Sequence, residues 1–412
     1  MNFVHIADIH FDTPFKTISD RMGIGEVRRL EQRRAFKQVI DFIKENKVEY
    51  LFICGDLYEQ QYIRKSTIDY INRLFEEIPN TKIFITPGNH DPNIKTSYYD
   101  IYKWANNVKI FNSNVEIINE KEVDIYGFGF DDFEMNKNQL ENINKINKNK
   151  INILITHGDI YTESKYNPIK SNILNKIGFD YIALGHVHKR DEYYSGSLIS
   201  LGFDEPGEHG FIYGEINNNS DNNINNNINN NINNNINNNL NNNLNNNLNN
   251  NINNNINNNI NNNINNNINN NINNNLNNNI NNNLNNYSNN TITKKFIKAD
   301  EREFIEKEIN ISNYNSMEEI IDEINSINTS KNLYKIKLTG YRNFEINIDL
   351  KTIKSDIIKI KDFTKLKYQI KENKNTIMGN YVKILNHKLE NNEINQDEYD
   401  DILEVMLSSL KK

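Results

Sequence analysis

The sequence predicts an α/β fold, a two-sheet sandwich flanked by helices, followed by smaller C-terminal parts. Three observations lead to this prediction. First, five short apolar runs alternate with amphipathic helical patterns along the first 190 residues. Second, polar clusters of Asp, Asn and His follow these runs, where an open α/β sheet builds its site. Third, a long asparagine tract separates this part from the rest of the chain.

The five runs have the length and composition of buried strands, because they are rich in β-branched and aromatic residues. They are Phe3–Ala7, Tyr50–Cys54, Lys82–Thr86, Ile151–Thr156 and Tyr181–Leu184. Between them, Glu26–Lys47 and Lys65–Ile78 repeat apolar residues at helical spacing. Further along, Ile125–Phe128, Glu192–Tyr194 and Phe211–Ile216 are typical of hairpin strands.

Residues 217–290 form an insert in which 54 of 74 positions are Asn, with an Ile or Leu at every fourth position from Ile224 to Leu284. Asn disfavours both helix and strand, and one thin apolar stripe cannot offset the entropy of ordering. We therefore expect a disordered loop, with aggregation-prone β-structure as the alternative. The flanking strands Phe211–Ile216 and Thr291–Ala299 are expected to form one hairpin around it.

The C-terminal part has ordinary composition again. A small α+β capping module is predicted from the strands Glu303–Ile311, Tyr334–Thr339 and Phe344–Leu350 and the helix Ser316–Ile327. Two amphipathic helices, Thr376–Leu389 and Gln396–Leu410, then form a C-terminal helical pair. The expected boundaries are 1–216 for the main domain, 217–290 for the insert, 291–300 for a returning strand, 301–371 for the capping module and 372–412 for the pair.

Composition excludes several classes of protein. The net charge of −7 excludes a broadly basic nucleic-acid binder, although a local basic groove stays open. The single cysteine, Cys54, excludes a domain stapled by internal disulfides. No apolar run reaches membrane-spanning length, and the polar N-terminus does not resemble a signal peptide. We expect a cytoplasmic protein without a membrane partner.

The polar clusters at the strand ends predict a dinuclear metal site. Oxygen and imidazole donors without thiolates suit Mn²⁺, Fe²⁺ or Zn²⁺ better than Ca²⁺. Seven donors exceed one tetrahedral site, but one bridging carboxylate would serve two ions. The candidate ligands are Asp8, His10, Asp56, Asn89, His157, His186 and His188.

Two residues beside these donors are candidates for catalysis. His90 is not needed as a ligand and could donate a proton to a leaving alkoxide or stabilise developing charge. Asp91 could orient a neighbouring histidine. By contrast, His5, His209 and His387 lie outside such clusters, and we expect them to be structural or surface residues.

The motifs Asp8-x-His10, Gly55-Asp56, Gly88-Asn89-His90-Asp91, His157 and Gly185-His186-x-His188 resemble those of calcineurin-like metallophosphoesterases. The stretches 7–15 and 202–210 resemble more narrowly the SbcD-type (YhaO-like) DNA repair exonucleases. The resemblance covers residues 1–216 well, residues 291–371 loosely, and the insert not at all.

The resemblance implies a ligand assignment and partners. It implies Asp8, His10, Asp56 and His188 for one ion, and Asp56, Asn89, His157 and His186 for the other, so that Asp56 bridges. It implies two divalent ions, Mn²⁺ first, with Fe²⁺, Zn²⁺ or Mg²⁺ as alternatives, and His90 as the catalytic histidine. The implied partners are DNA, an SbcC-like coiled-coil ATPase and a second copy of the chain, joined through helices at 65–78 and 96–106.

The function expected from these features is metal-dependent phosphodiester hydrolysis of DNA in repair or recombination. A phosphomonoesterase or a cyclic-nucleotide phosphodiesterase would share the metal motifs, but the capping module and helical tail argue against a minimal phosphatase. A metal-free scaffold on the same fold is the third alternative, and it is disfavoured because none of the ligand positions is lost.

Overall fold

The computed structural model describes residues 1–18, 23–136, 139–143, 146–218, 290–329, 331–366 and 376–410. These residues fall into two compact units. The first unit is drawn from residues 1–14, 29–199 and 208–300, and the second from 15–28, 200–207 and 301–412. Residues 15–28 and 200–207 therefore pack with the C-terminal unit, although the sequence places them inside the main domain.

Two sheets form the first unit. The larger has the strand order β10-β9-β1-β2-β3-β4, in which β1 to β4 run parallel. Its strands are β1 (Asn2–Ile6), β2 (Tyr50–Cys54), β3 (Lys82–Thr86), β4 (Val108–Ile110), β9 (Gly210–Asn218) and β10 (Asn290–Lys298). The smaller sheet contains β5 (Glu116–Asn119), β6 (Val123–Gly127), β7 (Ile151–His157) and β8 (Tyr181–Gly185) in that order. The predicted two-sheet α/β class is confirmed.

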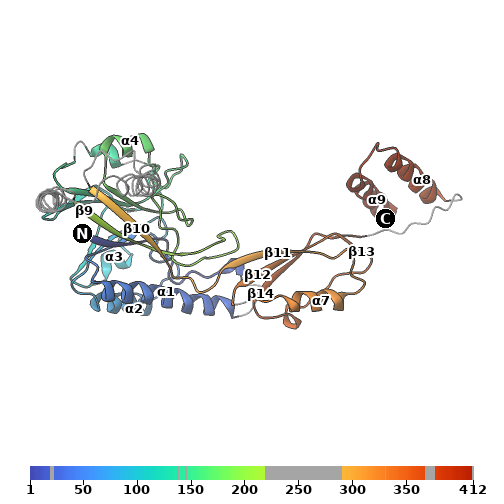
Figure 1. Ribbon diagram of the computed structural model, residues 1–412, viewed down its shortest axis with the longest axis horizontal. Helices are drawn as coiled ribbons and strands as arrows, with labels where there is room; N and C mark the ends of the chain where they lie inside the picture. The colour runs from blue at the N-terminus through green and yellow to red at the C-terminus, as the bar shows by residue number, and fades with distance from the viewer. Residues whose placement is uncertain are drawn as a thin grey trace, which may run out of the picture. The chain divides into compact units, whose positions relative to one another are not determined.

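The main core lies between the two sheets, where fully buried Phe52 and Ile153 belong to one apolar cluster. Helices α1 (Ile24–Asn46) and α2 (Lys65–Glu76) cover the outer face of the larger sheet (Figure 1). Helix α4 (Ser171–Ile177) and the 3₁₀ segment η2 (Gln139–Asn142) cover the smaller sheet. The helix expected at 96–106 is only the short α3, Tyr98–Ile101.

The expected hairpin around the insert is confirmed, since β9 and β10 pair antiparallel from Gly210↔Lys298 to Asn218↔Asn290. The other hairpin strands are confirmed in part. Residues 123–127 form β6, which pairs antiparallel with the preceding strand β5 as a hairpin and parallel with β7 on its other side. Residues 192–194 are not a strand, and Tyr194 makes only an isolated bridge to Leu184.

Deleting residues 220–288 is expected to leave the fold almost unchanged. The deletion joins Asn219 to Asn289 between the paired residues Asn218 and Asn290, which gives a two-residue loop. Asn tolerates the positive φ angles that such hairpin turns require. Thermal unfolding should shift by only a few degrees, because loop-closure entropy varies by about 0.6 kcal/mol per doubling of length. A large loss of melting temperature would mean that the insert packs on the domain.

The second unit contains the predicted α+β module. Parallel strands β11 (Phe304–Asn310), β12 (Leu333–Thr339) and β14 (Ile357–Asp362) pack against α7 (Met317–Ser326). The predicted capping box holds in part, since Ser316 accepts from the amide of Glu319. The strand predicted at 344–350 is wrong. This segment is irregular, although its alternate apolar residues still pack on the module's core. The third strand of the sheet is β14 instead. The two-stranded pair β13 (Tyr341–Arg342) and β15 (Lys365–Leu366) completes the module.

Residues 15–28 and 200–207, which belong to the second unit, pack at one end of this module. Arg28 is fully buried, donates to the carbonyl of Ser200 at 2.8 Å, and lies 5.4 Å from the ring of Phe304. Phe203 meets the same ring edge-on at a centroid distance of 4.8 Å. Residues distant in sequence therefore pack around Phe304 at the start of β11.

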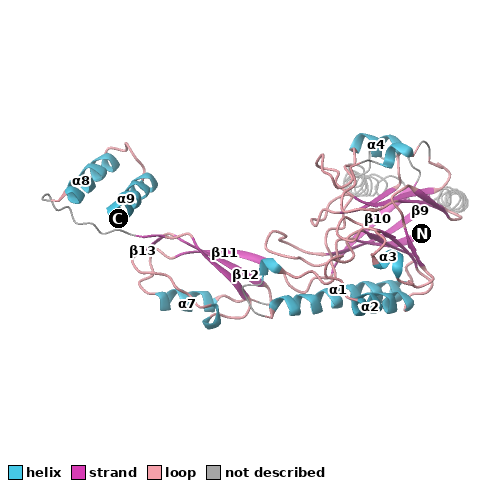
Figure 2. Cartoon of the chain, turned by 180° about the vertical axis from the view of Figure 1, so that it is seen from behind, coloured by secondary structure: helices cyan, strands magenta, loops and turns pink. Residues whose placement is uncertain are grey.

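Helices α8 (Ile377–Glu390) and α9 (Gln396–Leu410) form the expected pair (Figure 2). Val382, Leu385 and Leu403 are buried between them. In the described part of the chain, no helix has both the length and the apolar character needed to cross a membrane.

Candidate metal centre

The predicted donors converge because two parallel strand sets end at the same place. Asp8 and His10 follow β1, Asp56 follows β2 and Asn89 follows β3, all in the larger sheet. His157 ends β7, and His186 and His188 follow β8 in the smaller sheet. Carboxyl ends of parallel strands meet at one edge, so each sheet contributes one wall.

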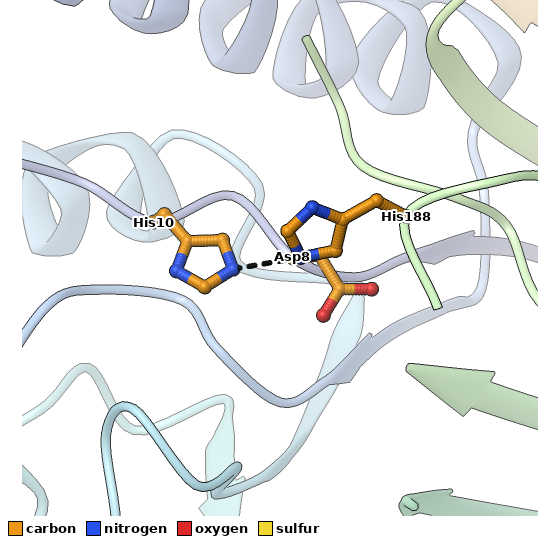
Figure 3. Close-up of side chains that lie close together, drawn as sticks. All are labelled: Asp8, His10 and His188. Atoms are coloured by element: carbon orange, nitrogen blue, oxygen red, sulfur yellow. Dashed lines mark hydrogen bonds between the residues drawn. The ribbon is translucent and has the colours of Figure 1, made fainter. Parts of the chain in front are cut away.

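The first group of donors is Asp8, His10 and His188 (Figure 3), whose ligand atoms lie within 4.8 Å of one another. The Nε2 atoms of His10 and His188 are 3.2 Å apart. Asp8 is also held in place by the backbone, because its two carboxylate oxygens accept from the amide of His186 at 3.0 and 3.1 Å.

The second group of donors consists of Asp56, Asn89, His157 and His186, and it adjoins the first group at Asp56. Asp56 Oδ2 lies 3.6 Å from His10 Nε2 and 3.4 Å from His157 Nε2. Asn89 Oδ1 lies 3.0 Å from His157 Nε2 and 3.2 Å from His186 Nδ1. The structure thus brings together all seven predicted donors, with Asp56 facing donors at both ends.

The backbone around these donors is strained. Asp8, His10, Asp56 and His186 have φ angles of 52°, 52°, 51° and 109°, in the region that favours glycine. Such strain persists only where surrounding contacts over-determine it, and it concentrates at functional sites. Gly88 is needed beside Asp56, because a Cβ there would lie 2.2 Å from Asp56 Oδ1.

His90 lies at the solvent side of the cluster. Its side chain is 45% exposed, and its Nδ1 lies 3.0 Å from Glu59 Oε2. This hydrogen bond raises the pKa of His90 to about 9. The other oxygen of Glu59 lies 2.8 Å from His10 Nδ1, so one carboxylate orients two histidines. Sequence reasoning missed Glu59, although its place three residues after Asp56 puts it on the same strand-end loop.

The side chain of Asp91 is fully buried. Among the described residues, no histidine forms a hydrogen bond with it. Its carboxylate accepts from the amides of Gly88, Asp56 and Leu57 at 2.7 to 3.0 Å, and from the hydroxyl of Tyr99 at 2.6 Å. It therefore fixes the two loops that carry Asp56 and Asn89 rather than the expected histidine ring.

The charges of the cluster fit divalent cations. Asp8 and Asp56 are buried, and within the described residues their ion-pair partners are histidines alone. Burial raises the pKa of Asp8 to about 7 and lowers that of His157 to about 3. Buried carboxylates beside neutral imidazoles lack compensating positive charge, which bound cations supply.

Comparison with known proteins shows what this part of the chain is similar to. Residues 1–190 match the family model of calcineurin-like phosphoesterases. This match covers less than half of the chain. The family consists of hydrolases that act on phosphoesters with divalent metal ions, in agreement with the donor set.

Two relatives extend the likeness. Over 240 residues the chain is 27% identical to the uncharacterized metallophosphoesterase YhaO of Bacillus subtilis, covering 53% of this chain and 58% of the relative. Over 265 residues it is 24% identical to the SbcD subunit of the nuclease SbcCD of Staphylococcus saprophyticus, covering 53% and 66%. The chain thus spans less than two thirds of either relative.

Proposed function

We propose that the chain is a metal-dependent DNA nuclease, an exonuclease or endonuclease that acts in DNA repair or recombination. The observation that carries the proposal is the convergence of seven oxygen and imidazole donors around Asp56, beside the exposed ring of His90. The likeness to a relative named as part of a nuclease supports a nucleic acid over other phosphoesters.

In this proposal Asp8, His10, Asp56 and His188 would hold one ion, and Asp56, Asn89, His157 and His186 would hold the second. Bound ions, Mn²⁺ in our preferred assignment, would polarise the phosphoryl oxygens and activate water. His90 donates a proton to the departing oxygen, and Glu59 holds the ring in position through Nδ1. Asp91 maintains the loop geometry on which both depend.

The assay that tests the proposal uses purified full-length protein, linear duplex and single-stranded DNA, and added Mn²⁺ or Mg²⁺. Metal-dependent cleavage that EDTA abolishes is expected. Hydrolysis of p-nitrophenyl phosphate or a cyclic nucleotide without any cleavage of DNA would favour the phosphomonoesterase or cyclic-nucleotide alternative. Absence of bound metal and of all hydrolysis would favour the scaffold.

The proposed protein partner is an SbcC-like coiled-coil ATPase, docked on the helical pair. Large apolar side chains stay exposed there, with Ile377 at 87%, Ile384 at 56% and Val405 at 65%. Two polar contacts, Tyr341 to Asp400 at 2.5 Å and Lys365 to Asp401 at 3.1 Å, link α9 to the module but cover none of these residues.

A homodimer through α2 and α3 belongs to the same proposal.

Truncation after Ile370 is expected to abolish co-purification with a co-expressed SbcC-like ATPase, while metal-dependent cleavage of short DNA persists. The reason is that the truncation removes the exposed apolar faces of α8 and α9 and leaves the metal cluster intact. Ile384→Asp with Val405→Asp should have the same effect in the full chain, whereas Lys383→Ala on α8 should not. Full-affinity binding by the truncated protein would contradict docking on the pair.

A further inference from the structure

Arg190 is an exposed residue in the loop that follows the metal donors of β8. Only Lys189 stands between it and the donor His188, so the two Cα atoms are at most about 7 Å apart. His188 is itself partly exposed. Both residues are reached by solvent, so an extended ligand can contact them together without a connecting cavity.

The guanidinium of Arg190 lies over an aromatic ring. Its Cζ is 3.7 Å from the centroid of the Phe296 ring, on β10. A guanidinium in this position keeps its in-plane N–H groups available for the oxygens of a phosphate. Within the described residues, no carboxylate forms an ion pair with Arg190. Its charge is therefore available to an anion from outside the chain.

Lys294 holds the same loop from the same strand. Its amine donates to the carbonyl of Glu192 at 3.3 Å. Lys294 lies two residues before Phe296, so both side chains are on one face of β10. Lys294 is also exposed. Two cations thus lie where β10 contacts the loop that follows the donors.

The register of the larger sheet gives the position of this contact. Phe296 pairs with Ile212, and Ile212 pairs with His5, three residues before the donor Asp8. Neighbouring strands are about 4.8 Å apart, which puts Phe296 about 10 Å from His5 across the sheet. The phosphates of one strand follow each other at about 3.4 Å along a duplex. A strand with one phosphate at the cluster therefore has others at the distance of Arg190.

The acidic residues of the loop leave the guanidinium unoccupied. Asp191 Oδ1 accepts from the amides of Tyr193 and Tyr194 at 2.8 and 3.1 Å, and Oδ2 accepts from the hydroxyl of Tyr161. Glu192 is exposed, and its described polar contact is the carbonyl that Lys294 binds.

Two basic residues of α1 are instead paired within the protein. Arg33 lies 3.5 Å from Asp12, and Lys37 pairs with Asp41 and Glu77. Binding an external phosphate there would compete with these carboxylates. Arg190 and Lys294 have no such competitor in the described part of the chain.

We propose that Arg190, stacked on Phe296 and flanked by Lys294, binds a backbone phosphate of the DNA strand whose cleaved phosphate lies at the metal cluster. The proposal rests on the proposed nuclease function and deepens it, because it selects a polymer with several phosphates over a small phosphoester. The contact carries no base specificity, since it is made to the backbone alone.

The kinetic test uses the Mn²⁺-loaded full chain. It compares kcat/KM for a short DNA oligonucleotide with kcat/KM for bis(p-nitrophenyl) phosphate, which has no second phosphate. Arg190→Ala should lower the ratio of the two about 3- to 30-fold, the range between an exposed ion pair and a charged hydrogen bond. The loss should appear as a higher KM for DNA at a similar kcat. Arg190→Lys, which keeps the charge, should restore part of the ratio.

The matched control is Lys121→Ala, which removes an exposed cation just before β6. Because β6 runs parallel to β7, this residue lies at the edge of the smaller sheet opposite the donors. The ratio should stay at the wild-type value.

Binding is measured separately by fluorescence anisotropy of labelled duplex DNA with the full chain in EDTA, where no cleavage occurs. The slope of log Kd against log salt concentration should fall by about 0.9 in Arg190→Ala, as expected for one lost phosphate contact. Lys294→Ala should also lower it.

An unchanged slope or an unchanged ratio in Arg190→Ala would overturn the proposal, as would a wild type that binds no DNA. If the wild type binds DNA through Arg190 but cleaves none with any metal, the nuclease proposal fails while the backbone contact stands.

Discussion

Asp56→Asn is expected to lose both metal ions and with them all metal-dependent hydrolysis. The carboxylate faces donors at both ends of the cluster, 3.6 Å from His10 and 3.4 Å from His157. A neutral amide offers one oxygen without charge, so it cannot neutralise two cations as a carboxylate does. Metal content by mass spectrometry should fall from two ions to well below one per chain, with hydrolysis of bis(p-nitrophenyl) phosphate at background.

The matched control is Asp41→Asn, which changes a half-exposed carboxylate on α1 that pairs with Lys37. It should retain two ions and wild-type rates. Because Asp56 also accepts from the amide of His90 at 2.8 Å, circular dichroism must show that the variant is folded. A folded Asp56→Asn protein with two ions bound would remove the bridging role from Asp56.

The sequence predicts much of the first unit because its signals are local. Each buried strand carries a run of apolar residues, and the polar donors follow directly where that run ends. The ranges Tyr50–Cys54 and Lys82–Thr86 are predicted with the bounds that β2 and β3 have. The convergence of Asp8 with His186, 178 residues apart, needs only the rule that parallel strands share a carboxyl edge.

The features that escape prediction depend on contacts between distant residues. Glu59 has no motif of its own, and its importance appears only when His10 and His90 are seen on its two oxygens. Asp91 is expected near a histidine from its place in the chain, but burial turns it toward backbone amides. The segment at 344–350 has the alternation of a strand but no neighbouring strand with which to pair.

His90→Ala is expected to keep both metal ions and to slow hydrolysis by roughly 10²–10⁴-fold, the usual contribution of a positioned proton donor. Its ring is exposed at the mouth of the cluster, while its Nδ1 is occupied by Glu59 at 3.0 Å. In the proposed mechanism Nε2, the ring nitrogen that does not contact Glu59, donates the proton. Removing the ring leaves Asn89 and Asp56 in place, so metal content should stay at two ions per chain.

Comparing three variants separates the role of His90 from that of a ligand. Glu59→Gln keeps the ring but weakens its orientation, so it should lose about 10–100-fold in rate. His387→Ala removes an exposed histidine on α8 and should leave rate and metal content unchanged. If His90→Ala loses an ion, His90 is a ligand, and if it cleaves DNA at the wild-type rate, it takes no part in catalysis. Only slow hydrolysis with two ions bound fits a proton donor that Glu59 holds beside the metal cluster.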